Sequence, residues 1–400
     1  MDSAADTEPV SAAVRGRTVA QTSEAELLAG FLPLLRGDGA GDGAGAAGVS
    51  YTLLGPGDDC AVVAAPDARF VISTDTQVQG QDFLLEWPSG AVTRGADTGA
   101  KAAAQNLADA AAMGAVPSAL VVSLTLPGAT PVAWVHDFAR GLRDGIAACG
   151  ADRAQVVGGD LGSGAELSVT VTVTGDLQGR APVLRSGARD GDHAVLAGTV
   201  GRAAAGLALL RSPAYRPGAD PRLDELAAAQ LRPVTPVPLG AALAEAGATA
   251  MIDVSDGLHR DAGRVAKASG CVVDLAPEAL ERLAEPLRPA AELLGTDPLE
   301  WVVAGGEDHG LLAFLPPGAR LPPGARGIGS VRLPGATTPG RVADDRPAGA
   351  HPASSGAVLI GGRAVEELLG EGRERGWDHF ERAHRSELGG GPTVAGPGRP

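Results

Sequence analysis

Residues 53–76, LLGPGDDCAVVAAPDARFVISTDT, combine two short apolar runs with a concentration of hard oxygen ligands. A glycine-framed acidic pair, Asp58 and Asp59, precedes the first run, and the second run leads into the tetrad STDT at residues 73–76. Carboxylates and hydroxyls at strand ends suit Mg²⁺, which proteins usually hold with a few carboxylates together with substrate phosphates. This stretch therefore predicts a divalent-metal site, around which the rest of the chain is interpreted.

The same device, an apolar strand that ends in glycine and a carboxylate, recurs at three further places. These are GGD at residues 158–160, DVSDG at 253–257 and GGED at 305–308. Glycine lets the backbone approach a ligand closely, although a single such dipeptide is usually only a turn. If the carboxylates converge, like charges 4 Å apart repel by roughly 4 kcal/mol per pair, so the cluster needs metal. Partly coordinated Mg²⁺ with open positions for polyphosphate points to phosphoryl transfer.

Composition excludes several classes of protein. The chain has 400 residues, which suggests two domains, and 44% of them are hydrophobic, enough for a sizeable core. The formal net charge of −15 argues against binding of nucleic acid, which requires clustered basic residues. No apolar run of about 18 residues is present to span a bilayer, and we expect a cytoplasmic protein with no membrane partner. The three cysteines lack CxxC spacing and are expected to be buried, reduced thiols.

Hydrophobic periodicity predicts a mixture of helices and strands without regular βαβα alternation, which favours an α+β fold with two sandwich-like halves. Helices are expected at residues 97–115, 132–146, 203–210, 223–231 and 258–269, and strands at 119–126, 167–174, 194–197, 249–253 and 301–304. Residues 316–356, rich in proline and glycine, are expected to be irregular. The domains are expected to be a disordered leader (1–22), an N-terminal domain (23–180) with a flexible glycine-rich loop (37–48), a C-terminal domain (181–384) and a disordered tail (385–400).

Other nucleotide-binding and hydrolytic signatures are missing. The sequence contains no GxxxxGK[ST] P-loop and no HRD catalytic loop. It also has no GxSxG elbow and no HExxH zinc motif. The acidic loops are therefore the best candidates for the chemistry.

Together with neighbouring motifs, the acidic loops carry a family resemblance. In chain order the motifs are GDDCA (57–61), STDT (73–76), NLAD (106–109), AMGA (112–115), GGD (158–160), LRSGA (184–188), DVSDGL (253–258), GGED (305–308) and WDHF (377–380). Over about residues 23–380 they resemble the thiamine-monophosphate kinases, which belong to the superfamily of aminoimidazole ribonucleotide synthetase and bind ATP without a P-loop. The resemblance implies two α+β domains, a homodimer formed through the N-terminal sheets, and direct transfer of the ATP γ-phosphoryl group to thiamine monophosphate. The product is thiamine diphosphate, and no phosphoenzyme is implied.

The resemblance also implies roles for individual residues. The implied ligands of several Mg²⁺ ions are Asp59, Asp75, Asp109, Asp160 and Asp253, with Ser73 or Thr74 assisting and Asp256 at an outer metal. The implied ATP contacts are Gly159, Asp160, Arg185 and Ser255, and the implied catalytic residues are Asp160, Arg185 and Asp253. The implied substrate contacts are Glu307 and Trp377, whose indole would stack on the cationic thiazolium ring.

Two positions depart from the family pattern. Asp82 stands where the family usually has histidine, so the substrate contact expected at this position is made by a carboxylate rather than an imidazole. Leu161 follows GGD where the family commonly has threonine, which removes a hydroxyl near the phosphates. Asp58 is interpreted as turn chemistry, and Lys101 as a solvated i,i+4 partner of Asp97 rather than a phosphate ligand.

Two alternative functions remain at this stage. Selenophosphate synthetase would require a reactive N-terminal cysteine beside a lysine, whereas Cys60 lies inside the apolar CAVV run. A non-catalytic protein that binds Mg²⁺ and nucleotide, or a thiamine phosphate, would need fewer carboxylate loops than this chain has.

Overall fold

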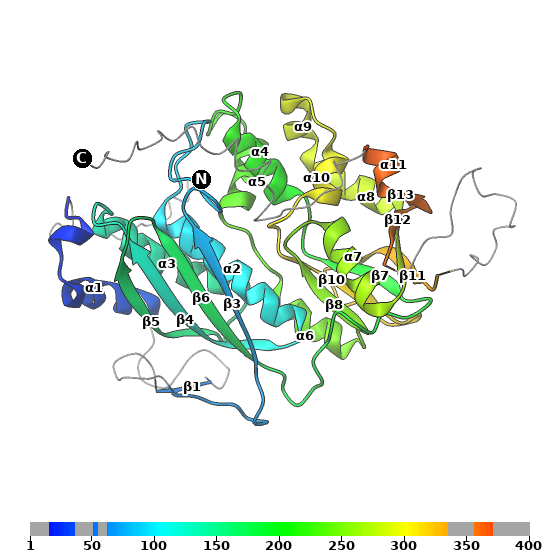
Figure 1. Ribbon diagram of the computed structural model, residues 1–400, viewed down its shortest axis with the longest axis horizontal. Coiled ribbons are helices and arrows are strands. Elements are labelled where there is room, and N and C mark those ends of the chain that lie inside the picture. The colour runs from blue at the N-terminus through cyan, green and yellow to red at the C-terminus, as the bar shows by residue number, and fades with distance from the viewer. Residues whose placement is uncertain (1–15, 37–50, 55–61, 335–355, 371–400) are drawn as a thin grey trace, which may run out of the picture.

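The computed structural model describes residues 16–36, 51–54, 62–334 and 356–370, and it contains two large sheets with helices between and around them (Figure 1). The N-terminal half holds a four-stranded sheet in the order β3-β6-β4-β5, and the C-terminal half a seven-stranded sheet in the order β13-β12-β9-β11-β7-β10-β8. A two-stranded ribbon, β1-β2, stands apart. This arrangement confirms the predicted α+β class.

The strands are β1 Thr52–Leu54, β2 Val62–Val63, β3 Val71–Val78, β4 Val116–Leu126, β5 Gln155–Ser163, β6 Ser168–Asp176, β7 His193–Ala197, β8 Ala250–Val254, β9 Val272–Leu275, β10 Gly310–Leu315, β11 Ala325–Arg332, β12 Val358–Ile360 and β13 Arg363–Ala364. The α-helices are α1 Glu24–Arg36, α2 Gly95–Ala112, α3 Val132–Ala148, α4 Arg202–Arg211, α5 Pro221–Leu231, α6 Val237–Glu245, α7 Leu258–Ser269, α8 Pro277–Ala284, α9 Arg288–Leu294, α10 Pro298–Ala304 and α11 Val365–Leu369. Two 3-10 turns, Val19–Gln21 and Glu285–Leu287, complete the described elements. In the described part of the chain, the helices are too short or too polar to cross a membrane.

Helix α2 lies at the centre of the molecule, between the two sheets (Figure 1). It contacts β3, β6 and β4 on one side, and α6, β8 and β10 on the other. Most of its residues are buried, which explains why its sequence is dominated by alanine. Any side chain that α2 directs at the boundary between the halves is therefore held rigidly.

Helices α2 and α3 pack at backbone contact because glycines face each other across their interface. A Cβ added to Gly95 would lie 2.0 Å from the carbonyl oxygen of Trp134, and one added to Gly141 would lie 2.0 Å from that of Ala96. Neither position could accept a side chain without separating the helices. Part of the high glycine content thus has a structural cause.

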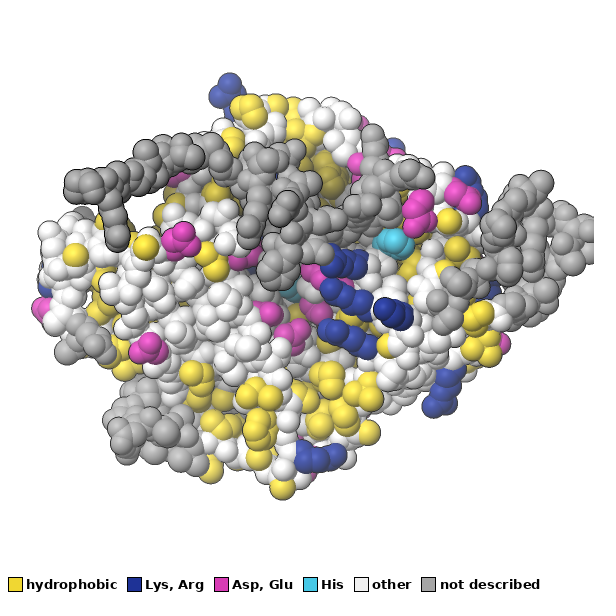
Figure 2. Space-filling model, in the orientation of Figure 1, with side chains coloured by type: hydrophobic (Ala, Val, Ile, Leu, Met, Phe, Trp, Pro, Cys, Tyr) yellow, Lys and Arg dark blue, Asp and Glu magenta, His cyan; other side chains and the backbone are white. Residues whose placement is uncertain are grey.

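The outward face of the four-stranded sheet is not covered by any described element. Strand β6 alternates, with its valines buried against α2 and α3 and its threonines directed outward, which confirms the predicted half-buried strand at residues 167–174. Two large apolar side chains on this face, Ile72 and Val121, are 64% and 45% exposed. Figure 2 shows apolar side chains (yellow) along the lower part of this face.

Three predictions about secondary structure were wrong. Residues 301–304 lie in helix α10, because Asp297 caps it through Leu299 N–H at 2.9 Å and Pro298 occupies its first turn. Within the predicted irregular segment 316–356, residues 325–332 form strand β11. The STDT and GGD motifs lie inside strands β3 and β5 rather than after their ends, so their side chains alternate between two faces.

The cysteine prediction was right for the two described thiols. Cys149 and Cys271 are free and buried. Burial raises the pKa of the Cys149 thiol to about 11, so this thiol stays protonated. Cys60 lies outside the described residues.

Candidate functional site

A pocket of about 370 Å³ lies between the N-terminal and C-terminal halves. Four polar residues line it: Ser73 from β3, Asp109 from α2, Asp253 from β8, and Arg185 from the segment between β6 and β7. The segment carrying Arg185 is fixed to β8, because the Met251 N–H donates to the Leu184 carbonyl at 3.0 Å. Residues that the sequence implied for metal and phosphate therefore meet at one boundary.

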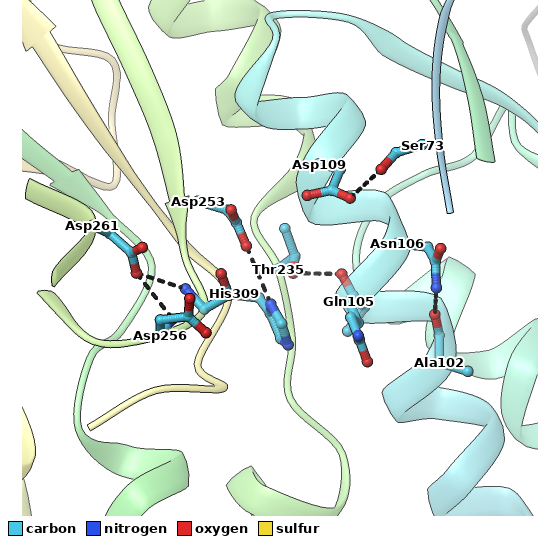
Figure 3. Close-up of polar contacts among 12 residues, drawn as sticks. Ser73, Ala102, Gln105, Asn106, Asp109, Thr235, Asp253, Asp256, Asp261 and His309 are labelled. Carbon is cyan, nitrogen blue, oxygen red and sulfur yellow. Dashed lines mark hydrogen bonds and ion pairs between the residues drawn. The ribbon is translucent and has the colours of Figure 1, made fainter. Parts of the chain in front are cut away.

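Asp109 and Asp253 face this boundary from opposite halves of the chain (Figure 3). Burial, with the negative charges of Asp253 and Asp75 nearby, raises the pKa of Asp109 to about 6. The Ser73 hydroxyl, which donates to Asp109 Oδ2 at 2.5 Å, opposes that rise. His309, whose Nδ1 lies 3.4 Å from Asp253 Oδ2, also opposes the rise, and a bound cation would favour the ionised form of Asp109 further.

Strand alternation separates the members of the STDT motif. Ser73 and Asp75 face α2, where the Asp75 N–H donates to Asn106 Oδ1 at 3.2 Å. Thr74 lies on the opposite face and donates its hydroxyl to the Val171 carbonyl at 3.0 Å. Of the two implied hydroxyl ligands, the structure therefore places Ser73 at the pocket and Thr74 away from it.

Gly159 and Asp160 lie on strand β5, away from the pocket that Ser73 and Asp109 of the same chain line. Strand β5 is the edge strand farthest from β3, and Asp160 pairs with Ser123 on the exposed outward face. Gly159 is required by packing, since an added Cβ would lie 2.1 Å from the Val122 carbonyl oxygen. Leu161 points the other way, into the core, which explains why an apolar residue stands there.

The DVSDG loop is held by a carboxylate that the sequence interpretation missed. Asp261 on α7 is fully buried and accepts the N–H groups of Ser255 and Asp256 at 3.1 and 3.0 Å (Figure 3). Burial and the charge of Asp253 raise the pKa of Asp261 to about 7, although Arg264 lowers it. Asp256, the implied outer metal ligand, forms an ion pair with Arg264.

The GGED loop packs directly on the DVSDG loop. The Glu307 N–H donates to the Ser255 carbonyl at 2.8 Å, and a Cβ on Gly306 would lie 2.2 Å from the same oxygen. Asp308 caps helix α4 by accepting the N–H groups of Arg202 and Ala203, both at 3.2 Å. Glu307 is thereby directed towards the boundary, with a left-handed backbone φ of 66°.

A second polar cluster surrounds Glu307. Lys101 Nζ lies 2.7 Å from Glu307 Oε1, and Gln230 Nε2 donates to Glu307 Oε2 at 2.6 Å. Burial alone would raise the pKa of Glu307, but Lys101 and Gln230 hold it below its usual value. Asp82 and Glu307, both expected to contact the substrate, line the same small pocket.

The predicted pairing of Lys101 with Asp97 was wrong. Asp97 caps its own helix through the Arg94 N–H at 2.8 Å and lies 2.9 Å from the guanidinium of Arg232. Lys101 is only 4% exposed, so its ammonium group requires a partner inside the protein. Glu307, distant in the chain, provides that partner.

The carboxylates do not form a complete metal cage in the described ranges. Among the described residues, no three Asp, Glu, His or Cys side chains are grouped closely enough to hold a metal ion. Asp58, Asp59 and Trp377 lie outside those residues. The described part of the site therefore offers pairs of carboxylates rather than a closed cluster.

Comparisons with known proteins identify relatives of this chain. The family model for "AIR synthase related protein, N-terminal domain" matches residues 57–177. A curated relative named thiamine-monophosphate kinase from Mycobacterium tuberculosis is 46% identical over 280 residues, which are 70% of this chain and 79% of the relative. The protein of the same name from Corynebacterium glutamicum is 40% identical over 69% of this chain and 80% of its own length.

Solved structures of proteins with these names also resemble this chain. The structure described as AaThiL complexed with AMPPCP and TMP matches with a TM-score of 0.63 and 27% identity, covering 80% of this chain and 89% of that chain. Thiamine-monophosphate kinase from Stenotrophomonas maltophilia K279a matches with a TM-score of 0.62 and 29% identity, covering 79% and 92%. Hydrogenase maturation protein HypE, at 19% identity and a TM-score of 0.56, shares the fold.

Proposed function

The chain belongs to the thiamine-monophosphate kinase family, and from that premise we propose that it transfers the γ-phosphoryl group of ATP to thiamine monophosphate, giving thiamine diphosphate. The observation that carries the proposal is the pocket where Ser73, Asp109, Arg185 and Asp253 meet between the two halves. A related structure is described as AaThiL complexed with AMPPCP, which is an analogue of ATP, and with TMP. ATP is accordingly the co-substrate.

The donor set fits Mg²⁺. Asp75, Asp109, Asp253 and the Ser73 hydroxyl offer hard oxygen atoms, and burial together with the nearby charges of Asp253 and Asp75 raises the pKa of Asp109, which a bound cation would lower. Because the described residues supply carboxylates in pairs, substrate phosphates would complete the coordination, as is usual for this ion. When bound, Mg²⁺ neutralises charge on the transferred phosphoryl group. More than one ion fits the spread of carboxylates, and Asp59 and Asp256 remain proposed ligands.

The protein's own residues position the two substrates. Arg185 lines the pocket beside the carboxylates, where its guanidinium would bind and neutralise a phosphate of ATP. Ser255 holds the GGED loop through its carbonyl, so a nucleotide contact by Ser255 would also set the position of Glu307. Because phosphoryl transfer requires mainly alignment and charge neutralisation, rigid mounting of these groups on α2 and β8 serves the reaction.

The acceptor, thiamine monophosphate, would lie towards Glu307 and Asp82. These residues line a pocket next to the Lys101 ion pair, and Glu307 stays ionised because its pKa is lowered. A carboxylate suits the cationic thiazolium ring. Trp377 remains a proposed stacking partner.

We also propose a homodimer that covers the outward face of the four-stranded sheet. Ile72 and Val121 are exposed there, and a second copy would bury them. Asp160 lies on the same face, so its proposed contact with phosphate would be made within the dimer interface. Light scattering after size-exclusion chromatography should give twice the chain mass, and Val121→Glu should halve it. An unchanged mass for the variant would contradict this interface.

A cytoplasmic location, where ATP is available, goes with the proposal.

The test of the function is direct. Purified protein incubated with ATP, Mg²⁺ and thiamine monophosphate should yield equal amounts of thiamine diphosphate and ADP, measured by chromatography. Removal of Mg²⁺ with EDTA should stop the reaction, and its return should restore it. Hydrolysis of ATP without formation of thiamine diphosphate would contradict the proposal.

A further inference from the structure

Arg264 on α7 lies between two carboxylates, one in the DVSDG loop and one on its own helix. Its Nη1 lies 2.5 Å from Asp261 Oδ1, and its Nη2 forms an ion pair with Asp256 Oδ2. The Asp261 side chain is fully buried, whereas those of Asp256 and Arg264 are 21% and 35% exposed. The guanidinium therefore joins a carboxylate inside the protein to one that solvent can reach.

These contacts form a closed ring around the turn that follows β8. Asp261 accepts the N–H groups of Ser255 and Asp256 through Oδ2, and its Oδ1 accepts from Arg264. Arg264 in turn binds the Asp256 carboxylate, so both the backbone and the side chain of Asp256 are held. A planar guanidinium can bind two carboxylates at once, which a lysine ammonium does less well. The ring thus keeps the Asp256 carboxylate directed towards α7.

A third carboxylate lies close to this ring. Asp253, three residues before Asp256, lines the pocket between the halves, and burial together with the charge of Asp253 raises the pKa of Asp261. Arg264 binds two of the three carboxylates, including the one implied as an outer metal ligand. A metal ion that approaches Asp256 would therefore meet a carboxylate already paired with a positive charge, and like charges repel.

We propose that Arg264 is the protein's own counter-ion for Asp256 and competes for this carboxylate with the metal ion that Asp256 would bind. The inference rests on the proposed function, in which Asp256 is an outer metal ligand. Arg264 gives up Asp256 when metal and nucleotide bind, and its contact with the buried Asp261 remains. The released Nη2 group is then a free donor, which suits a phosphate oxygen. Arg264 is thus a positioning residue that sets how tightly the outer metal ion is held.

The test measures metal binding directly. Mn²⁺ takes the same oxygen ligands as Mg²⁺, and the electron paramagnetic resonance signal of the free ion gives the bound fraction. With AMPPCP present, Arg264→Gln should lower the dissociation constant for Mn²⁺ about fivefold, the effect expected when a partly exposed ion pair no longer competes. Arg264→Lys keeps the charge and should lie between wild type and Arg264→Gln. A merely structural role predicts the opposite sign, because a loosened loop would bind metal more weakly.

Two further variants control for the fold and for the loss of an ion pair. The amide introduced by Arg264→Gln can still donate to Asp261, three residues earlier on the helix. In the Asp261→Asn background, where no buried charge is left unpaired, the same substitution should again tighten Mn²⁺ binding. Arg140→Gln removes an Arg–Asp ion pair of the same spacing on α3, with Asp137, and should leave Mn²⁺ binding unchanged.

The outcomes separate this inference from the proposed function. Unchanged or weaker Mn²⁺ binding on Arg264→Gln in the Asp261→Asn background would overturn the competition, whatever the single variant does. Tighter Mn²⁺ binding without any formation of thiamine diphosphate would overturn the function and keep the competition. Formation of thiamine diphosphate with an Mn²⁺ affinity that does not depend on Arg264 would keep the function alone. No binding of Mn²⁺ by wild type would overturn both.

Discussion

Each end of the interface between β3 and α2 holds a carboxylate, but the pKa of this carboxylate is raised at one end and lowered at the other. One end is the pocket lined by Ser73, Asp109, Arg185 and Asp253, which we call the phosphate pocket after its proposed ligand, and there burial and nearby carboxylates raise the pKa of Asp109 to about 6. At the other end, Glu307 is paired with Lys101 and has a lowered pKa. Figure 2 shows acidic and basic side chains gathered near the centre of the molecule, between its two halves. The first end would suit a cation, whereas at the second end Lys101 already balances the charge of Glu307.

The largest expected effect comes from removing charge at the phosphate pocket. Asp109→Asn should lower kcat by about 10²–10³-fold, because a metal ligand is lost where charge must be neutralised. The melting temperature of the ligand-free variant should rise by about 3 °C, because the variant has no buried carboxylate to ionise and no repulsion from Asp253.

Steady-state kinetics and calorimetry measure both effects. Asp137→Asn, at a partly exposed carboxylate on α3, is the matched control and should change neither. An active Asp109→Asn enzyme would remove this residue from the metal site.

A smaller effect is expected at the paired end. Lys101→Met should destabilise the protein by about 3 kcal/mol, since it leaves the Glu307 charge without its partner. Glu307→Gln should be comparably destabilising, because it leaves the buried Lys101 ammonium unpaired. The double variant should recover most of that loss.

Urea unfolding of wild type, the two single variants and the double variant gives the coupling energy between Lys101 and Glu307 by a double-mutant cycle. Additive losses in the double variant would show that the pair is not coupled. Catalysis in these variants should be affected mainly through the KM for thiamine monophosphate.

The smallest effect is the pH dependence of stability. Folding raises the pKa of Asp109 and Asp308 to about 6 and that of Asp261 to about 7, from a usual value near 3.8. Between pH 4 and pH 7 the native state therefore binds more protons than the unfolded state, so stability falls as the pH rises. The ligand-free protein should melt a few degrees higher at pH 5.5 than at pH 8.

Scanning calorimetry at both pH values measures this slope, which Asp109→Asn should reduce. Saturation with Mg²⁺ and ATP should flatten it further, since bound cations favour the ionised carboxylates. A melting temperature that rises with pH would contradict the electrostatic description of the phosphate pocket.

The sequence indicated more residues of the pocket between the halves than of the cluster around Lys101 and Glu307, for physical reasons. Ser73, Asp109 and Asp253 belong to short motifs, and their hydroxyl and carboxylate groups are the kinds of ligand that indicate metal binding. The pair of Lys101 and Glu307 joins residues that are distant in the chain, and no local spacing reveals it. Gln230 belongs to no motif, and only the fold shows that it donates to Glu307.

Errors in secondary structure came from competing local signals. In β3 both faces are polar, so the alternation that separates Thr74 from Ser73 could not identify the face directed at α2. In α10 the paired valines favoured a strand, although the Asp-Pro start at residue 297 is a helix cap. Tertiary packing decided both cases.

Helix α2 carries a residue of each pocket, Asp109 at one end of the interface and Lys101 at the other. With a rise of 1.5 Å per residue, α2 holds these two residues about 12 Å apart along its axis, and it thereby fixes the distance between the two ends of the site. Insertion of one residue between them would turn Lys101 by about 100° away from Glu307. Acceptors of a different length must therefore be accommodated by changes outside this helix, in the segments 79–94 and 305–308.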